Sequence, residues 1–288
     1  MNKQIPCSTA AAVEPLAGTA PFARGWLILE HPVPWGRDAL TQSELPSEVV
    51  SHILDAQAQG PLMFLAARRS GADGRRRPET GPRRVWLAHC APEGGLVRTG
   101  MVTGPEGLLD IDLSQIANGH LPDFGEHVVA SIEFVCTHST RDACCAVHGR
   151  RRIATASPDV WECSHLGGHR FAATSLFLPS GRLYGRLGSW REPGEPEPEY
   201  LRGPSYLPAP LQAAECAVRI HAQISPDQAL HVTEIQSLDE GPTVQARDTN
   251  GRSWTVECRW VMSQSPASCG GDPKPRYTWL ATIIAEGI

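Results

Sequence analysis

Short apolar runs bounded by turn-forming residues recur along the first part of the chain and predict strands. They cover residues 25–29, 62–66, 85–89 and 95–102. Between the first two runs, the spacing of apolar positions predicts a helix that begins near Asp38, whose carboxylate would cap it, and runs toward Ala56. A short helix over residues 111–117 is expected to close this part.

The second part of the chain repeats this order of elements. The predicted elements are a strand over residues 127–135, a helix over 143–153, a strand over 160–163, a hairpin over 171–187 and a helix over 211–221. Aligning the two parts sets Arg37-Asp38 opposite Arg141-Asp142, each pair between a strand and a helix. The repetition indicates an internal duplication, although an Arg-Asp pair that caps a helix also recurs by chance.

Beyond the repeated parts, strands alternate with turns from residue 230 onward and predict a small antiparallel β extension. The acidic, proline-rich segment 192–199 is typical of an exposed loop or linker. We therefore expect an α/β protein with three units, which are residues 1–122, residues 123–225 and residues 226–288.

Composition and charge narrow the class of protein. The chain has 288 residues, 41% of them hydrophobic, which suffices for two modules with cores of their own. Its net charge is −5, and its basic residues do not gather into a long face, so nucleic acid is not expected as the main partner. The run Arg75-Arg76-Arg77 is expected to be a solvated loop.

Cysteine usage and hydropathy indicate the compartment. Nine cysteines are an odd number for a disulfide framework, and the first residues lack the apolar core of a signal peptide. No stretch approaches the run of about eighteen apolar residues that a membrane helix needs. We expect a cytoplasmic protein without membrane insertion, where paired cysteines are more often metal ligands or redox thiols than disulfides.

The residues that carry chemistry lie in the second part of the chain. Cys136 and the vicinal pair Cys144-Cys145 are followed by His165 and His169, so thiolate and imidazole donors gather in a short stretch. Between the histidines, Gly167-Gly168 allows a tight loop that turns both rings toward one metal, because glycine accepts backbone angles that other residues resist. The pattern predicts an iron or zinc site at a loop.

Several motifs around these donors form a recognisable set. They are Cys136-Thr-His-Ser-Thr-Arg-Asp142 with Cys145 after it, Ser164-His-Leu-Gly-Gly-His-Arg-Phe-Ala172, Gly181-Arg-Leu-Tyr-Gly-Arg186, Glu14-Pro-Leu-Ala-Gly-Thr-Ala20, Pro34-Trp-Gly-Arg-Asp-Ala-Leu40 and Leu211-Gln-Ala-Ala-Glu215. Over roughly residues 7–221, the chain resembles the sucrase/ferredoxin-like family, a branch of the thioredoxin-like [2Fe-2S] ferredoxins. The resemblance implies two thioredoxin-like modules, each a mixed sheet flanked by helices. The second module would carry the iron–sulfur site and the first would be a degenerate partner.

The resemblance also implies ligands and an activity. Cys136 and Cys145 would bind one iron, and His165 and His169 the other. The protein would carry single electrons between a reductase and an acceptor protein rather than turn over a substrate, and we expect no glycosidase activity. Two imidazoles in place of two thiolates make the cluster less negative, so its potential is expected to be raised. A proton on the outer ring nitrogen would make that potential depend on pH.

Four residues near these ligands have two interpretations each. Cys144 and Cys145 cannot easily face the same iron, because adjacent side chains in the first turn of a helix point about 100° apart. Cys144 therefore has no role at the cluster, or it replaces Cys145 as a ligand when Cys145 is removed. Cys163 approaches the cluster or belongs to the core. His138 contacts the cluster ligands, or it is a histidine at the surface or with hydrogen bonds unrelated to the cluster. Arg141 partly neutralises a reduced cluster or docks an acidic partner, or it is a surface charge that pairs with Asp142 or anchors its own loop.

Two other functions stay open. A structural zinc site accepts the same two cysteines and two histidines, although zinc fingers usually place their first two cysteines about two to four residues apart. A thiol-redox or redox-sensing protein would suit a thioredoxin-like fold, but a Cys-x-x-Cys motif at the start of a helix is missing.

Overall fold

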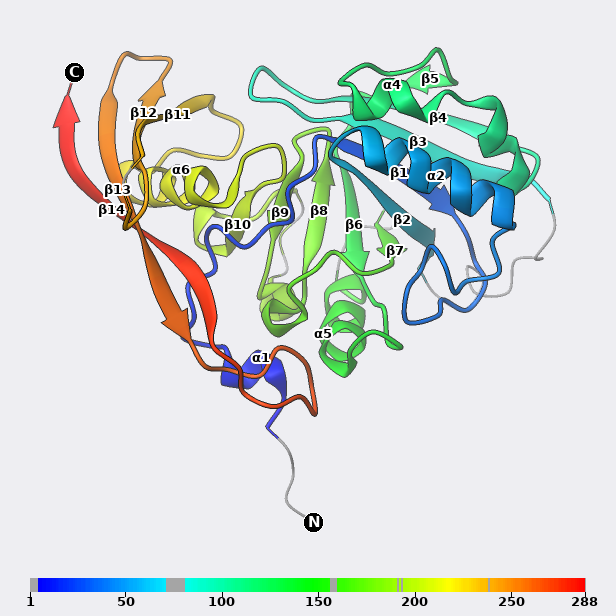
Figure 1. The fold of residues 1–288 in the computed structure, drawn as a ribbon, viewed down its shortest axis with the longest axis horizontal. Helices are drawn as coiled ribbons and strands as arrows, with labels where there is room; N and C mark the ends of the chain where they lie inside the picture. The colour runs from blue at the N-terminus through cyan, green and yellow to red at the C-terminus, as the bar shows by residue number, and fades with distance from the viewer. Residues whose placement is uncertain are drawn as a thin grey trace.

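The computed structural model describes residues 5–70, 81–155, 160–190, 192, 194–237 and 239–287. The strands of this part of the chain form a curled, ten-stranded mixed sheet and a separate four-stranded antiparallel sheet (Figure 1). This arrangement confirms the α/β class and the β extension that the sequence predicts. The arginine run at residues 75–77 lies outside the described residues.

The first half of the large sheet lies within residues 25–127. Its strands are β1 (Gly25–Glu30), β2 (Leu62–Arg69), β3 (Arg83–His89), β4 (Leu96–Val102) and β5 (Glu126–His127), and its helices are α2 (Ser47–Gln59) and α4 (Leu113–Ala117), with a 3-10 turn at η1 (Pro105–Asp110). A short helix, α1 (Cys7–Ala10), precedes them. β1 is buried along its whole length because it pairs with β2 on one side and with β3 on the other.

The second half carries the predicted metal ligands. Its strands are β6 (Ile132–Cys136), β7 (Trp161–Cys163), β8 (Ser175–Leu178), β9 (Arg182–Tyr184) and β10 (Leu201–Pro204), its helices are α5 (Ala143–Ile153) and α6 (Ala209–Ala222), and its 3-10 turns are η2 (His169–Phe171), η3 (Leu187–Ser189) and η4 (Pro198–Tyr200). The predicted helix over residues 143–153 is confirmed as α5, and β8 and β9 form the predicted hairpin.

The two halves repeat one strand order. The sheet runs β2-β1-β3-β4-β5 in the first half and β7-β6-β8-β9-β10 in the second. In the first half, β1 has β2 as its parallel neighbour and β3 as its antiparallel neighbour. In the second half, β6 is flanked in the same way by β7 and β8. β2 and β7 pair antiparallel, with Ala67 opposite Cys163, and so join the halves into one sheet. The repeated order of elements expected from the sequence is therefore present.

Two predicted elements are wrong in their extent. The helix expected from Asp38 begins only at Ser47, because the Asp38 carboxylate accepts the amides of Leu40 and Thr41 and closes a local turn instead. Pro46, which has no amide hydrogen, directly precedes that helix. The strand expected over residues 127–135 is two strands, β5 and β6, which lie at different places in the sheet. The apolar residues between them are not a buried strand, since Val129 is 92% exposed.

Part of the acidic, proline-rich segment is packed against the large sheet. Glu195 accepts a hydrogen bond of 2.7 Å from the Tyr184 hydroxyl of β9, and Pro198 is buried. The segment leads directly into β10, the edge strand of the large sheet. The expectation of an exposed loop is therefore correct for Glu192, Gly194, Glu197 and Glu199 and wrong for Pro196 and Pro198.

The second sheet consists of β11 (Leu230–Gln236), β12 (Thr243–Asp248), β13 (Ser253–Ser263) and β14 (Arg276–Gly287). Helix α6 contacts both β10 and β14, so it lies between the two sheets. The chain between β13 and β14 reaches back to α1 beneath the large sheet (Figure 1). None of the helices in the described ranges combines the length and the apolar character that crossing a bilayer requires.

Candidate metal centre

The four predicted ligands come from consecutive segments of the second half of the large sheet. Cys136 is the last residue of β6, and Cys145 lies in the first turn of α5. His165 follows β7, and His169 begins η2. Asp142 fixes the start of α5, because its carboxylate accepts the Cys144 amide at 2.8 Å.

The structure brings these four side chains together. His165 Nδ1 lies 3.8 Å from the sulfur of Cys136 and 3.8 Å from that of Cys145, and the three donor atoms are all within 4.8 Å of one another. On its other side, His165 Nε2 lies 3.3 Å from Nδ1 of His169. The two cysteines are fully buried, whereas the histidines are partly exposed. The imidazole of His165 therefore stands between a buried thiol pair and a second imidazole.

The pKa values of Cys136 and Cys145 are shifted in opposite directions. A hydrogen bond from Cys145 and a second one from His165 hold the pKa of Cys136 well below its usual value in spite of burial. The same hydrogen bond to Cys136, together with burial, raises the pKa of Cys145. Burial also lowers the pKa of His169, which favours the neutral imidazole that ligates metals. Both shifts favour the forms that bind metals, a thiolate at Cys136 and a neutral imidazole at His169.

The loop between the histidines depends on its glycines. Gly167 and Gly168 have φ angles of +72° and +65°, which favour glycine. Arg202 of β10 is fully buried against this loop and donates to the carbonyl of Gly167 at 3.1 Å and to that of Leu166 at 3.4 Å. A Cβ on Gly168 would lie 2.5 Å from Nη2 of Arg202. The predicted role of the glycine pair in forming a tight loop is therefore consistent with its backbone angles.

Arg202 was not identified from the sequence. It lies 33 residues beyond the last predicted ligand, and only the pairing of β10 with β9 brings it to the loop. Burial, followed by the nearby charge of Arg170, lowers the pKa of Arg202 to about 9. The thiols of Cys136 and Cys145 act in the opposite direction and raise the pKa of this buried guanidinium.

The four residues expected around the ligands lie in different surroundings. Cys163 stands opposite Cys136 in the parallel pairing of β6 and β7, where burial raises its pKa well above the usual value. His138 Nε2 hydrogen-bonds the carbonyl of Gly36 at 2.7 Å and so connects the second half to the first. Cys144 faces away from the His165 group, toward Cys269.

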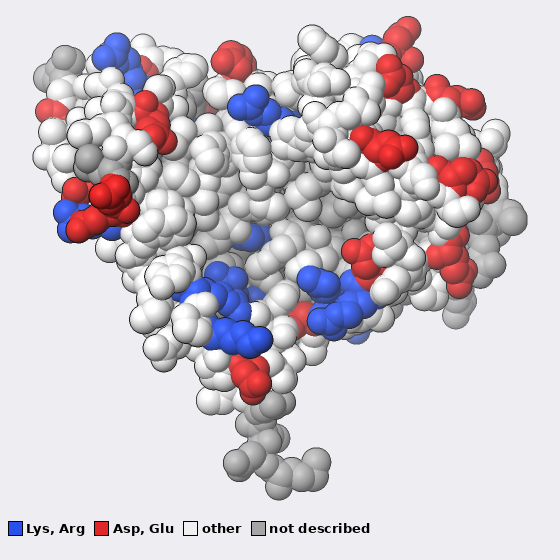
Figure 2. Space-filling view, in the orientation of Figure 1, with Lys and Arg blue, Asp and Glu red and all other residues white. Residues whose placement is uncertain are grey.

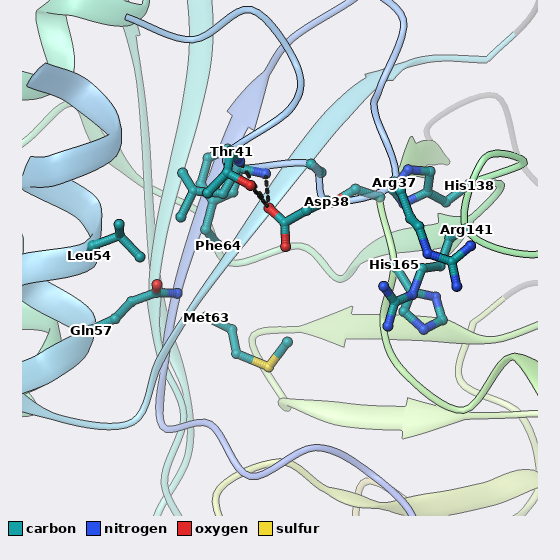
Figure 3. A pocket seen from close by; sticks show the side chains of 13 residues that line it. Arg37, Asp38, Thr41, Leu54, Gln57, Met63, Phe64, His138, Arg141 and His165 are labelled. Carbon is teal, nitrogen blue, oxygen red and sulfur yellow. Dashed lines mark hydrogen bonds between the residues drawn. The ribbon is translucent and has the colours of Figure 1, made fainter. Parts of the chain in front are cut away.

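Arg141 lines a pocket of about 300 Å³ that reaches His165. In Figure 3, Arg37 and Arg141 lie beside His165 at one end of this pocket, while Leu54 and Gln57 of α2 lie at the other. Figure 2 shows basic side chains on both sides of a hollow in the lower middle of the molecule. His165 therefore lies beside two arginine side chains at this end of the pocket.

A second group of potential ligands was missed from the sequence. Cys7, Asp142, Cys144 and Cys269 have donor atoms within 4.8 Å of one another. Cys7 and Cys269 are 262 positions apart, so no spacing within a motif could have linked them. Only the folding of the β13–β14 connection onto α1 brings them together.

Comparison with known proteins identifies the family. A model of the sucrase/ferredoxin-like family matches residues 16–191. No curated protein and no solved structure matches the chain. The matched span is more than half of the 288 residues and contains Cys136, Cys145, His165 and His169. The expectation drawn from the motifs is thus confirmed, and the chain belongs to the sucrase/ferredoxin-like family.

Proposed function

We propose that this protein is a one-electron carrier that holds a [2Fe-2S] cluster through Cys136, Cys145, His165 and His169. The observation that carries the proposal is the convergence of two buried thiols and two imidazoles in the second half of the sheet. When bound, such a cluster accepts and releases one electron, while the protein sets its potential and its exposure.

The donor set fits a cluster with two kinds of ligand. The thiols of Cys136 and Cys145 lie on one side of His165, and the ring of His169 lies on the other. We assign the cysteines to the buried iron and the histidines to the iron nearer the surface. Arg202 would offset part of the negative charge of the thiolates, since its guanidinium is buried close to them.

We further propose that each half of the sheet is a thioredoxin-like module. The repeated order of a parallel pair, an antiparallel neighbour and a further antiparallel strand supports this proposal, as does the helix that follows β1 and β6 in each half. The ligands lie at the end of β6, in the first turn of α5 and after β7 of the second module. The corresponding loops of the first half carry no such set of cysteines and histidines, so this half would provide support and surface rather than ligands.

Histidine ligands would give the site a raised potential that depends on pH. Two neutral imidazoles leave the cluster less negative than two thiolates would, which favours the reduced form. A histidine bound through one nitrogen keeps a proton on the other, and reduction makes that proton harder to lose. The potential should therefore fall as pH rises through the range in which this proton is lost.

The pocket beside His165 is our proposed docking surface for a redox partner. Arg37 and Arg141 present two positive charges next to the partly exposed imidazole. An acidic patch on a reductase or an acceptor protein would be drawn to this end of the pocket by charge complementarity. An electron would then pass between the docked partner and the cluster through the histidine side of the site.

A single zinc ion is the second candidate. The donor atoms of Cys136, Cys145 and His165 lie close enough together to surround one ion. Such a site would have a structural role and would not carry electrons.

The test is anaerobic purification followed by visible and electron paramagnetic resonance spectroscopy. Wild-type protein should be red-brown, and H165C and H169C should each shift the visible bands and the resonance of the reduced state. H52C is the matched control, since His52 hydrogen-bonds the carbonyl of Ile111 in the first half of the sheet. Unchanged spectra in both ligand variants would rule out the assignment. A colourless protein with stoichiometric zinc would favour the second candidate.

A further inference from the structure

Three cysteines from distant parts of the chain meet around the carboxylate of Asp142. Cys7 begins α1, Cys144 lies in the first turn of α5, and Cys269 lies in the connection between β13 and β14. The sulfur of Cys269 is 3.3 Å from that of Cys144 and 3.7 Å from that of Cys7. Cys7 and Cys144 are buried, and Cys269 is partly exposed.

These separations fit the ligands of one tetrahedral zinc ion. Zinc–sulfur bonds of about 2.3 Å place two thiolates about 3.8 Å apart, and a carboxylate oxygen at about 2.0 Å would lie about 3.5 Å from each sulfur. Asp142 Oδ1 lies 3.7 Å from the sulfur of Cys7. The thiols are thus spaced as ligands of a common ion, and three thiols are more than one disulfide would use.

The surroundings hold Asp142 in place as a ligand. Its two oxygens accept the amides of Cys144 and Cys269, each at 2.8 Å, which leaves lone pairs free on both. The hydroxyl of Ser8 lies 3.2 Å from the sulfur of Cys144 and 3.1 Å from Nε2 of His148, so it can donate a hydrogen bond to a thiolate. The carboxylate and one thiol are therefore oriented by groups outside the ligand set.

An apolar pocket of about 290 Å³ gives access to the thiols from the surface. Cys144, His148 and Cys269 line it, together with Ile5 and Val147. An ion can therefore reach the sulfurs without the sheets moving apart.

We propose that Cys7, Cys144, Cys269 and Asp142 bind a zinc ion that ties the N-terminal helix α1 and the β13–β14 connection to α5. This site is separate from the His165 group. It explains why a chain with nine cysteines directs one member of the vicinal pair, Cys145, toward His165 and the other, Cys144, toward the second group. The zinc ion would fasten the C-terminal sheet against the half that carries the ligands.

The test measures zinc by mass spectrometry in full-length protein purified from zinc-supplemented medium. Wild type should hold about one equivalent of zinc per chain. The zinc content per chain should be at least about five-fold lower in C269A and in C7A, because the three remaining donors bind zinc far more weakly. C216A is the matched control, since Cys216 is a buried thiol that contacts only the carbonyl of Leu201 among the hydrogen bonds of the described residues. Circular dichroism verifies that each variant is folded.

A second measurement does not depend on the variants. Wild-type protein loaded with cobalt in place of zinc should show the visible bands of tetrahedral cobalt with thiolate charge transfer, and these should be missing from C269A. The same measurement in C136A separates this site from the His165 group, because the C136A variant should keep the zinc or cobalt bound by Cys7, Cys144, Cys269 and Asp142. Zinc that is lost in C136A but kept in C269A would overturn the proposal, as would a Cys144–Cys269 disulfide in protein purified without oxidant.

Discussion

Nε2 of His169 lies 3.9 Å from Oδ2 of Asp142. The same carboxylate accepts the amides of Cys144 and Cys269, so it belongs both to the second thiol group and to the surroundings of the proposed cluster ligand. A negative charge at this distance stabilises a protonated outer nitrogen on His169 and opposes the addition of an electron nearby. Asp142 therefore does more than cap α5.

Replacing this carboxylate by an amide of the same shape should raise the reduction potential. We expect D142N to increase the midpoint by about 30 to 60 mV, where about 59 mV corresponds to a tenfold change in a one-electron equilibrium. Asparagine caps helices as well as aspartate does, so α5 should persist. The measurement is a redox titration followed in the visible spectrum.

Two comparisons isolate the charge in that experiment. Making the substitution in C269A protein removes any contribution from a zinc ion. D112N is the control, because Asp112 caps α4 through the amide of Ser114 and is part of the first half. A potential that falls, or one that rises equally in D112N, would contradict the role assigned to Asp142.

The glycine loop offers a second prediction. G168A should strain the backbone at a φ of +65° and push Cβ against the guanidinium of Arg202, whereas Gly167, at +72°, has open space around its Cβ position. The backbone strain alone costs about 1 to 2 kcal/mol in each variant. Only G168A should also displace the loop, and iron per chain should fall several-fold relative to G167A. Equal iron contents in the two variants would mean that Arg202 does not hold this loop.

Much of the large sheet could be predicted because its signals are local. β1 and β3 are apolar runs between turns, and α5 starts with a capping Asp142 directly after a loop. The His165 group could be predicted for the same reason, since its members lie within 34 residues and the family pattern links them. The wrong boundaries have local causes too. Asp38 caps a turn as readily as a helix, and its side chain alone does not distinguish the two.

The remaining features depend on contacts between distant segments. Neither Arg202 nor Cys269 belongs to a motif, and both reach their positions through sheet pairing and the path of the β13–β14 connection. Val129 is as apolar as a core residue yet exposed, so hydrophobicity gave no sign of the break between β5 and β6. Such relationships follow from the packed structure and leave no periodic trace in the sequence.

A buried ion pair connects the two elements that carry the cysteine ligands. Arg152 of α5 donates to both oxygens of Glu133 of β6, at 2.9 and 2.6 Å, and both side chains are buried. Glu133 thus has a structural role. E133A should lower the free energy of unfolding by about 3 to 5 kcal/mol, because it leaves a buried guanidinium without its partner.

Urea denaturation measures this loss, and an exposed pair provides its control. Arg259 and Glu257 form a similar contact of 3.0 Å, but their side chains are 58% and 30% exposed. E257A should therefore cost less than about 1 kcal/mol. Similar losses in E133A and E257A would show that burial of the Glu133–Arg152 pair contributes nothing to stability.

Glu14 gives a prediction for acid stability. Burial raises the pKa of its carboxyl, but hydrogen bonds from Ser263, Ser265 and Arg170 outweigh burial and hold the pKa below its usual value. A carboxyl with a depressed folded pKa stabilises the protein above its unfolded pKa, near about 4.3 for Glu, and this contribution disappears as pH falls through the folded pKa. Glu14 thus ties the N-terminal segment to the end of β13 wherever its carboxyl is ionised, and this contact weakens as pH falls through the folded pKa.

The E14Q variant separates this contribution from general acid sensitivity. At pH 7, E14Q should be less stable than wild type by about 1 to 3 kcal/mol, because hydrogen bonds to a charged group are lost. The difference should shrink as the pH falls below about 4. E240Q, at an exposed turn, should match wild type at every pH. Unfolding free energies from urea titrations between pH 7 and pH 3 measure these differences. A gap between E14Q and wild type that stays constant over this range would show that folding does not lower the pKa of Glu14.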